Sequence, residues 1–306
     1  MTALAADIGG THMRVGVVDD DGTVLHRERR RTDHGAPGAA QLAALVDAVL
    51  GDVRAGRTAA GASIEVGDDA DLIIGAPGRI DHRDGRLETA ANIPDTWIAE
   101  FHEDLLSERL GRRCHLANDA DLAAVGETWF GAGRGHDDVL YVTISTGIGA
   151  GLVLGRRLVH GRRSGGEIGH TVVDFDGSID GAPQTVEQLG SGTALGRAAA
   201  EAGLPGGAAL AALVRDGDPD ATAVWHRVVR VAAIGVSNLV WIAAPAAVVI
   251  GGGFGRNGDL VLEPIRQTIC EVGPADLVED LVIVEAALGD DAGLAGAAAW
   301  TEARAL

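Results

Sequence analysis

Two glycine-rich segments, each with a threonine among its glycines, are the clearest candidates for chemistry in this sequence. They are Asp7-Ile-Gly-Gly-Thr11 and Ser145-Thr-Gly-Ile-Gly149, and each follows an apolar run. Paired glycines remove Cβ atoms and permit positive φ, so the backbone can approach a phosphate closely. Successive N–H groups then form an anion nest, and the threonine hydroxyl can donate to a phosphate oxygen. The two segments therefore predict two phosphate-binding hairpins.

A third glycine run, Ile250-Gly-Gly-Gly253, also follows an apolar run and suits a flat approach to a nucleotide. Asp7 is expected to face Mg²⁺ through water, because Mg²⁺ keeps much of its hydration shell in proteins. For the first segment alone, the alternative is an ordinary tight hairpin with an aspartate in the turn. The residues expected to bind the nucleotide are Asp7, Gly9, Gly10, Thr11, Thr146, Gly147, Gly252 and Gly253.

A competing pattern overlaps the third glycine run. Gly253-Phe-Gly-Arg-Asn-Gly258 fits the dinucleotide fingerprint G-x-G-x-x-G after a strand. A dehydrogenase would leave the two hairpins without a role, and the fingerprint lies late in the chain. The sequence therefore favours phosphate transfer over hydride transfer.

The elements that would position these segments alternate between strands and helices. We expect strands at 3–8, 13–19, 23–31, 71–75, 113–117, 138–145, 152–154, 157–160, 247–250 and 281–285. We expect helices at 39–50, 97–110, 219–244 and 291–306. A strand, a glycine hairpin and further strands occur twice, which predicts an α/β protein of two similar lobes with a central cleft for one ligand.

Composition excludes several classes of protein. The 306 residues carry a formal net charge of −19, and the short runs Arg29–Arg31 and Arg162-Arg163 are too small to form a basic stripe for nucleic acid or an anionic membrane. Lysine is absent, so a Walker-A loop, a protein-kinase strand lysine and a pyridoxal Schiff base are all excluded. A phosphate must be held by backbone N–H groups, Mg²⁺, hydroxyls or arginine.

Cysteine usage and the N-terminal pattern point to a cytoplasmic protein. Cys114 and Cys270 lie far apart in apolar stretches, so we expect two inert buried thiols and no disulfide. The chain opens directly on a strand pattern, with no signal-peptide pattern and no long uncharged span after it.

Seven motifs in order along the chain resemble the ROK family (repressors, open reading frames and kinases), and within it the bacterial glucokinases. They are Asp7-Ile-Gly-Gly-Thr11, Leu116-Ala-Asn-Asp-Ala-Asp121, Trp129-Phe-Gly-Ala-Gly-Arg134, Ser145-Thr-Gly-Ile-Gly149, Gly165-Gly-Glu-Ile-Gly-His170, Ser191-Gly-Thr-Ala-Leu195 and Ile250-Gly-Gly-Gly253. The resemblance spans essentially the whole chain. It implies the actin-like ATPase (ribonuclease H-like) fold, ATP with Mg²⁺, a hexose-like substrate and a homodimer or homotetramer.

The expected division is a small N-terminal lobe of residues 1–117 plus the C-terminal helix 291–306, and a large lobe of residues 118–290. The resemblance also implies that Asp119 is the general base that takes the proton from the primary hydroxyl of the sugar. Phosphoryl transfer needs such an acceptor, and Asn118 beside it is expected to bind a sugar hydroxyl. The alternative for both residues is that they cap the following helix.

Further sugar-binding residues follow from the same resemblance. Glu167 and His170 are spaced i, i+3 and share a helix face, and Glu187 is expected to join them on the sugar hydroxyls. Gly78 and Asn92 match sugar-facing loops. The alternatives are a structural histidine for His170 and a solvated charge for Glu187.

The sequence departs from the family at its zinc loop, C-x-C-G-x-x-G-C. Asp180 and Ala182 stand where the first two cysteines would be, and the loop is two residues short. Without thiolates no tetrahedral zinc site can form in this loop, so the sequence predicts no structural zinc, and another group must orient the His170 ring. His12 stands where relatives often have lysine.

The expected reaction is phosphorylation of the primary hydroxyl of a hexose by ATP, with glucose as first choice. N-acetylglucosamine, N-acetylmannosamine, another hexose or a C7 cyclitol remain alternatives, as does a sugar-sensing protein without catalysis. A DNA-binding repressor is disfavoured, because the phosphate hairpin begins at Asp7 and no helix-turn-helix pattern precedes it.

Overall fold

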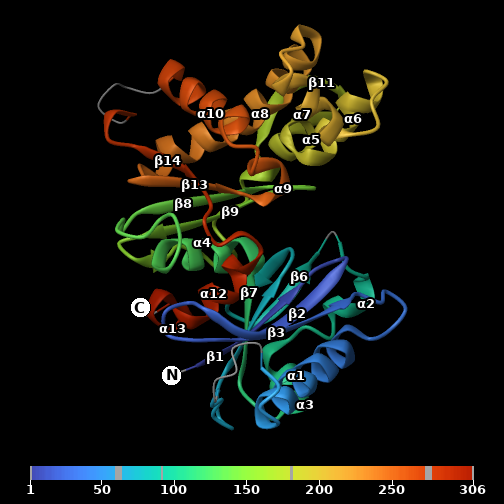
Figure 1. Cartoon of the computed structure of the whole chain (residues 1–306), viewed down its shortest axis with the longest axis vertical. Coiled ribbons are helices and arrows are strands. Elements are labelled where there is room, and N and C mark those ends of the chain that lie inside the picture. The colour runs from blue at the N-terminus through green and yellow to red at the C-terminus, as the bar shows by residue number, and fades with distance from the viewer. Residues whose placement is uncertain (1, 59–63, 91, 180–181, 273–277, 305–306) are drawn as a thin grey trace. The chain divides into compact units, whose positions relative to one another are not determined.

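The computed structural model describes residues 2–58, 64–90, 92–179, 182–272 and 278–304. The chain divides into two compact units (Figure 1). The first comprises Met1–Gly135, Gly151–Gly165 and Asp290–Leu306, and the second comprises His136–Ala150 and Gly166–Gly289. The lobe boundary expected after residue 117 stays a prediction. The first segment of the first compact unit extends beyond that position, to Gly135.

The first sheet has five strands in the order β3-β2-β1-β4-β7. The strands are β1 (Ala3–Ile8), β2 (His12–Val18), β3 (Val24–Arg31), β4 (Leu72–Ala76) and β7 (Cys114–Asn118). The three N-terminal strands form an antiparallel meander, whereas β4 runs parallel to β1 and β7 runs parallel to β4. The carboxyl ends of β1, β4 and β7 therefore meet at one edge of this sheet, where open α/β sheets bind their ligands.

Helices cover both faces of this sheet. α1 (Gly38–Arg54) packs on β2 and β3 and α3 (Glu103–Leu110) on β7, while α4 (Asp119–Trp129) and α12 (Ala292–Ala298) lie against the other face (Figure 1). Small residues let α4 and α12 approach closely, because a Cβ on Gly296 would lie 2.0 Å from the Leu122 carbonyl oxygen. Smaller elements of this unit are β5 (Arg79–Asp81), β6 (Arg86–Thr89), α2 (Asp95–Ile98), β10 (Arg157–Leu158) and α13 (Trp300–Arg304), and η2 (Gly289–Asp291) falls at the boundary of the two units.

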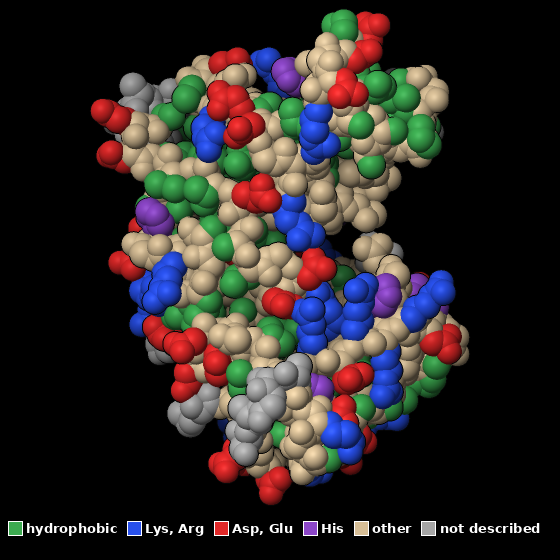
Figure 2. Space-filling model, viewed as in Figure 1, with side chains coloured by type: hydrophobic (Ala, Val, Ile, Leu, Met, Phe, Trp, Pro, Cys, Tyr) green, Lys and Arg blue, Asp and Glu red, His purple; other side chains and the backbone are tan. Residues whose placement is uncertain are grey.

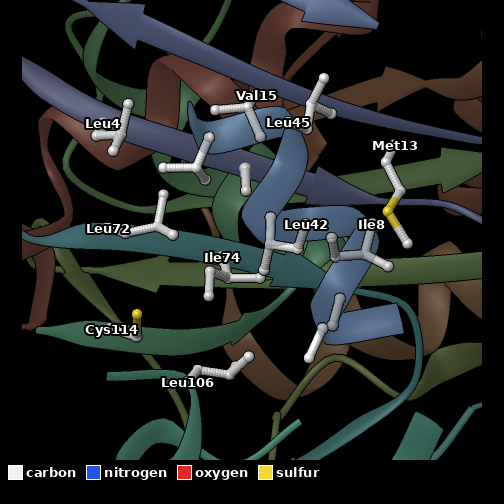
Figure 3. Close-up of a cluster of buried hydrophobic side chains, with 14 of the residues drawn as sticks. Leu4, Ile8, Met13, Val15, Leu42, Leu45, Leu72, Ile74, Leu106 and Cys114 are labelled. Atoms are coloured by element: carbon white, nitrogen blue, oxygen red, sulfur yellow. The ribbon is translucent and has the colours of Figure 1, made fainter. Parts of the chain in front are cut away.

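The core of the first unit lies between the sheet and α1 (Figure 3). Leu42 and Leu45 are spaced along one face of α1 and are fully buried against strand residues such as Leu4 and Ile74. Burying one such side chain contributes about 1.5–3 kcal/mol relative to exposure. This packing fixes α1 and the meander as one rigid support for the β1–β2 hairpin.

The second five-stranded sheet repeats the order of the first, as β10-β9-β8-β13-β14. Its strands include β8 (Val139–Ile144), β9 (Ile148–Leu154), β13 (Ala247–Gly251) and β14 (Val282–Glu285). β13 runs parallel to both β8 and β14, as β4 does to β1 and β7. The internal repeat predicted from the sequence is confirmed in sheet order.

The rest of the second unit surrounds β8 and β13 with helices. The longest, α8 (Pro219–Ala243), begins at an Asp218 cap that accepts from the Ala221 N–H, and ends at Ala244 with φ of 44°. The other elements are η1 (Ile168–His170), β11 (Val172–Ile179), β12 (Ala182–Thr185), α5 (Val186–Gly190), α6 (Gly192–Glu201), α7 (Gly207–Arg215), α9 (Gly252–Gly255) and α10 (Asp259–Val272).

Three expectations about elements and thiols were wrong. The helix expected at 97–110 is two helices, because His102 is extended and its ring nitrogen accepts from the Asp104 N–H to start α3 anew. The last helix is also divided, into α12 and α13. Cys114 is buried as expected, but Cys270 lies on the exposed face of α10.

Surface charge agrees with the composition. On the viewed face acidic side chains are interspersed among the arginines, although arginines gather over the β2–β3 region of the first unit (Figure 2). Among the described residues, no helix has both the length and the apolar character needed to cross a membrane.

Candidate functional site

In the first unit, the predicted site residues lie at the carboxyl ends of the three parallel strands. Asp7 is near the end of β1, Gly78 follows β4, and Asn118 ends β7 with Asp119 directly after it. Register places Asp7 beside Gly75 and Ala76 beside Asn118. The fold thus gathers residues separated by more than 100 positions along the chain at one sheet edge.

Asp7 is held by an arginine on the facing strand. Arg14 is its direct partner across the β1–β2 hairpin, and both Nε, at 3.0 Å, and Nη2 of Arg14 donate to Asp7 Oδ2. The remaining nitrogen, Nη1, donates to the Asp290 carbonyl oxygen at 2.6 Å. Because both contacts with Asp7 fall on one oxygen, Oδ1 can accept a hydrogen bond from a metal-bound water.

The glycines of the first hairpin serve close approach rather than positive φ. Neither Gly9 nor Gly10 is among the residues with positive φ, so that part of the sequence argument was wrong. A Cβ on Gly10 would lie 2.3 Å from the Asn92 carbonyl oxygen, a distance that real side chains do not tolerate. Thr32 supports the turn, since its Oγ1 donates to the Gly9 oxygen at 2.7 Å. Thr11 itself is exposed.

Asn118 has the capping geometry that the sequence left as its alternative. Its Oδ1 accepts from the backbone N–H of Ala120 at 2.9 Å and of Asp121 at 3.2 Å, which starts α4. Its Nδ2 donates to the Gly78 carbonyl oxygen at 2.8 Å. Gly78 is a required glycine, because its φ is 100° and a Cβ would lie 2.0 Å from the Thr89 oxygen. Any contact of Asn118 with sugar remains a prediction.

Asp119 is the first residue of α4 and is exposed. Its Oδ1 accepts from the Ala120 N–H at 2.9 Å, next to the Asn118 cap. An exposed carboxylate on a rigid helix start is suited to accept a proton from a bound hydroxyl.

In the second unit, the second hairpin joins β8 to β9 at residues 145–147 and is clamped by a distant glutamate. Glu187 Oε2, from the first turn of α5, accepts from the Ile148 N–H at 2.8 Å. A Cβ on Gly147 would lie 2.4 Å from that same oxygen. On the other side Thr193 Oγ1 donates to the Thr146 carbonyl oxygen at 2.7 Å. The structure thus brings Glu187 directly beside the predicted phosphate loop.

Glu167 and His170 lie together at η1, as their spacing predicts. Glu167 Oε2 is 3.7 Å from His170 Nε2, and both side chains are more than one third exposed. This carboxylate is the group that can orient the His170 ring in place of a metal. Gly169 packs closely on the second hairpin, since its Cβ would lie 2.3 Å from the Ile148 oxygen.

The third glycine run follows β13, the parallel neighbour of β8. Gly252 has φ of 83°, and its Cβ would lie 2.4 Å from the Ile144 carbonyl oxygen. Nothing lies within 4 Å of a Cβ on Gly253, which leaves open space at that position. The predicted nucleotide residues of this unit therefore adjoin one another at the ends of β8 and β13.

The segment that carries zinc ligands in the family forms the hairpin β11–β12 here. Ala182 is exposed at the start of β12, and Asp180 lies outside the described residues. The expectation of no structural zinc stays a prediction.

Sequence reasoning missed two features near these residues. The role of Arg14 was not recognised. Asp7 lies two residues before the turn at 9–12 and Arg14 two residues after it, so an antiparallel hairpin places them opposite each other. The pair Arg162-Arg163 was read only as a short basic run. Arg162 Nε and Nη2 donate to buried Asp81 Oδ2 at 2.9 and 2.7 Å, and Arg163 pairs with Glu88. The Arg162 hydrogen bonds lower the pKa of Asp81 to about 2.

Known proteins resemble this chain over nearly its full length. The ROK family model matches residues 3–304. A glucokinase of Thermotoga maritima is 34% identical, covering 98% of this chain and 97% of its own. Among solved structures, a ROK family glucokinase from Streptomyces griseus, in complex with glucose and AMPPNP, is 32% identical with a TM-score of 0.76, covering 98% of this chain and 99% of its own. A ROK hexokinase from Thermus thermophilus is 33% identical with a TM-score of 0.78 and 97% coverage of both chains.

The two repeated sheets are those of the actin-like ATPase fold. The chain belongs to the ROK family.

Proposed function

We propose that this protein is an ATP-dependent sugar kinase that phosphorylates the primary hydroxyl of a hexose, with glucose as the substrate. The observation that carries the proposal is the position of Asp119, an exposed carboxylate at the start of α4, next to the Asn118 cap. Two proteins named glucokinase are 34% and 32% identical to this chain over nearly its full length, which supports glucose as the sugar.

In the proposed reaction, the Asp119 carboxylate accepts the proton of the sugar hydroxyl. The hydroxyl oxygen forms a bond to the γ-phosphorus of ATP, while the bond from that phosphorus to the β-bridging oxygen breaks and ADP leaves with the electron pair. Such a transfer depends mainly on positioning and charge stabilisation. Glu167, His170 and Glu187 hold sugar hydroxyls, and Gly78, Asn92 and Asn118 shape the sugar-binding loops.

The phosphates of ATP are held by backbone N–H groups of the two hairpins and by the glycine run after β13. The residues proposed for this role are Gly9, Gly10, Thr11, Thr146, Gly147, Gly252 and Gly253. Glycine is required at position 10, since any side chain there would collide with the Asn92 carbonyl oxygen, and this close packing supports a hairpin of fixed backbone.

A magnesium ion fits the residues present, because Arg14 engages only one oxygen of Asp7. Asp7 would hold the ion through water, and the ion would neutralise charge on the phosphates when bound. Zinc has no place in this proposal. The protein is taken to act in the cytoplasm, as a homodimer or homotetramer.

A panel assay tests the proposal. ADP release would be measured with ATP, Mg²⁺ and one of glucose, N-acetylglucosamine, N-acetylmannosamine, fructose, allose or a C7 cyclitol. Fast turnover with glucose supports the proposal. Fast turnover with another acceptor keeps the kinase and changes its substrate, whereas silence across the panel from folded, ATP-binding protein favours a sugar sensor.

A further inference from the structure

Three side chains of metal-binding type lie together on β3 and α1. They are His26 and Glu28 from β3 and Asp52 from the last turn of α1, and one ligand atom from each lies within 4.8 Å of the other two. Among the described residues, no other group of three or more His, Cys, Asp or Glu side chains has its ligand atoms within this distance of one another. None of the three has a role in the proposed phosphoryl transfer.

The strand period explains why these side chains converge. His26 and Glu28 are two residues apart, so both point to the face of β3 that packs on α1. Arg27 and Arg29 point the other way, where Arg27 pairs with Asp291 and Arg29 contacts the His12 ring. Arg27 and Arg29 are therefore directed away from the cluster, whereas Arg30 shares its face of β3 and donates to the Ala44 carbonyl oxygen of α1 at 3.5 Å.

His26 is the unusual member. Its side chain is only 8% exposed, and its Nε2 is buried without a hydrogen-bond partner. Asp52 Oδ2 lies 3.5 Å from this nitrogen, beyond the usual 2.7–3.2 Å of an N–H···O bond. Buried polar atoms without a partner are rare in native structures, and a bound ion is one of the explanations.

The geometry suits a tetrahedral cation. Bonds of about 2.1 Å from zinc to nitrogen or oxygen place two ligands of a tetrahedron roughly 3.4 Å apart. That separation matches the observed distance between His26 Nε2 and Asp52 Oδ2. Glu28 is half-buried at the edge of the cluster, so a rotation of its flexible side chain can bring the carboxylate to the same ion.

The other oxygen of Asp52 is already positioned. Oδ1 accepts from Arg57 Nε at 2.9 Å and Nη2 at 2.7 Å, which fixes the carboxylate with Oδ2 toward His26. Metal ligands are commonly oriented in this way by an outer hydrogen bond.

We propose that His26, Glu28 and Asp52 form a binding site for Zn²⁺, with water as a fourth ligand. Imidazole with carboxylates suits zinc better than magnesium, which prefers an octahedral shell of oxygens. The bound ion joins β3 to the end of α1 and so stabilises the first unit. This site is distinct from the thiolate loop of the family, and zinc bound here would make the sequence-based expectation of no structural zinc wrong.

Zinc titration of the chelator-stripped full-length protein tests the site. We expect one equivalent of zinc bound per chain at low micromolar concentration, together with a rise in Tm. Glu28→Gln and Asp52→Asn should each weaken zinc binding at least about tenfold, while magnesium chloride at the same concentration should not raise Tm. Glu28→Gln changes a half-buried side chain, so it keeps the test meaningful if Asp52→Asn does not fold.

The matched control is Asp71→Asn. His115 Nε2 lies 3.1 Å from Asp71 Oδ2 in the same unit, a histidine–aspartate pair that is not part of such a cluster of three. This variant should bind zinc as the parent does. No zinc bound by the parent protein, or unchanged zinc binding in Glu28→Gln and Asp52→Asn, would overturn the proposal and leave His26 and Asp52 as an ion pair.

Discussion

The two sheets share one strand order but differ in what stands at their carboxyl ends. The first carries carboxylates on the sheet strands and the helix start, with Asp7 in β1 and Asp119 directly after β7. At the equivalent edge of the second, Thr146 and Gly252 follow β8 and β13. There the acids Glu167 and Glu187 come from the inserted segment between β10 and α6.

This difference separates the proposed chemistry from the proposed recognition. The proton acceptor and the residue assigned to the metal are fixed by the sheet and α4 in the first unit. The proposed sugar-binding acids come from short helices of the second unit, outside the strands of both sheets. Variation in acceptor between relatives would then concentrate in residues 159–190.

The largest expected effect on activity comes from a substitution at the carboxyl end of the first sheet, where α4 begins. Asp119→Asn should leave the fold intact, since the Asn118 cap remains, and should lower kcat about 10²–10⁴-fold, the usual range for a lost general base. Steady-state kinetics with glucose and circular dichroism check both statements. Near-normal kcat in this variant would refute the role of Asp119.

A smaller loss is expected when the support of Asp7 is removed. Arg14→Gln deletes the hydrogen bonds to Asp7 Oδ2, so the carboxylate is no longer fixed for a metal-bound water. We expect kcat to fall about tenfold and the Mg²⁺ concentration for half-maximal rate to rise. Arg27→Gln is the control, because Arg27 pairs with Asp291 at the sheet surface. A parallel loss in both variants would indicate a general effect on stability.

In the second unit, one substitution can distinguish two roles of Glu187, binding of the sugar and support of the phosphate hairpin. Glu187→Gln keeps an oxygen for the Ile148 N–H but loses the charge. If Glu187 binds sugar, KM for glucose should rise about tenfold with little change in KM for ATP. The reverse pattern would make Glu187 a clamp of the phosphate hairpin and remove it from the sugar site. Glu167→Gln, which does not touch the hairpin, should raise only KM for glucose.

The stability of the first unit should depend on pH through His82. Burial, and next the nearby His160 ring, lowers the pKa of His82 to about 4. The unfolded chain binds this proton at higher pH than the folded one, so stability falls as pH drops from about 6.5 to 4, by on the order of 2 kcal/mol. Urea unfolding of the parent and His82→Gln across this range checks it. An equal pH slope in both proteins would contradict the assignment.

The smallest effect contrasts the two cysteines, one in each unit. Burial raises the pKa of the Cys114 thiol to about 11, whereas Cys270 is exposed on α10. A thiol reagent at neutral pH should label Cys270 rapidly and Cys114 only after unfolding. Two fast thiols in the native protein would show that Cys114 is accessible, and Cys270→Ser identifies which thiol reacts.

The sequence predicted the parts of the fold that depend on local pattern. Apolar runs located the main strands, and the two glycine hairpins revealed the repeat. It failed where one side chain decided the outcome, as when His102 restarted a helix inside an amphipathic stretch. The contacts of Arg14 with Asp7 and of Glu187 with Ile148 depend on register and tertiary packing, which spacing along one segment cannot reveal.

The most direct test of the central claim is the product formed from ATP, Mg²⁺ and glucose. We predict ADP and glucose 6-phosphate in equal amounts, with both lost in Asp119→Asn. Folded protein that binds ATP and glucose but forms neither product would contradict the assignment of this protein as a glucose-phosphorylating kinase.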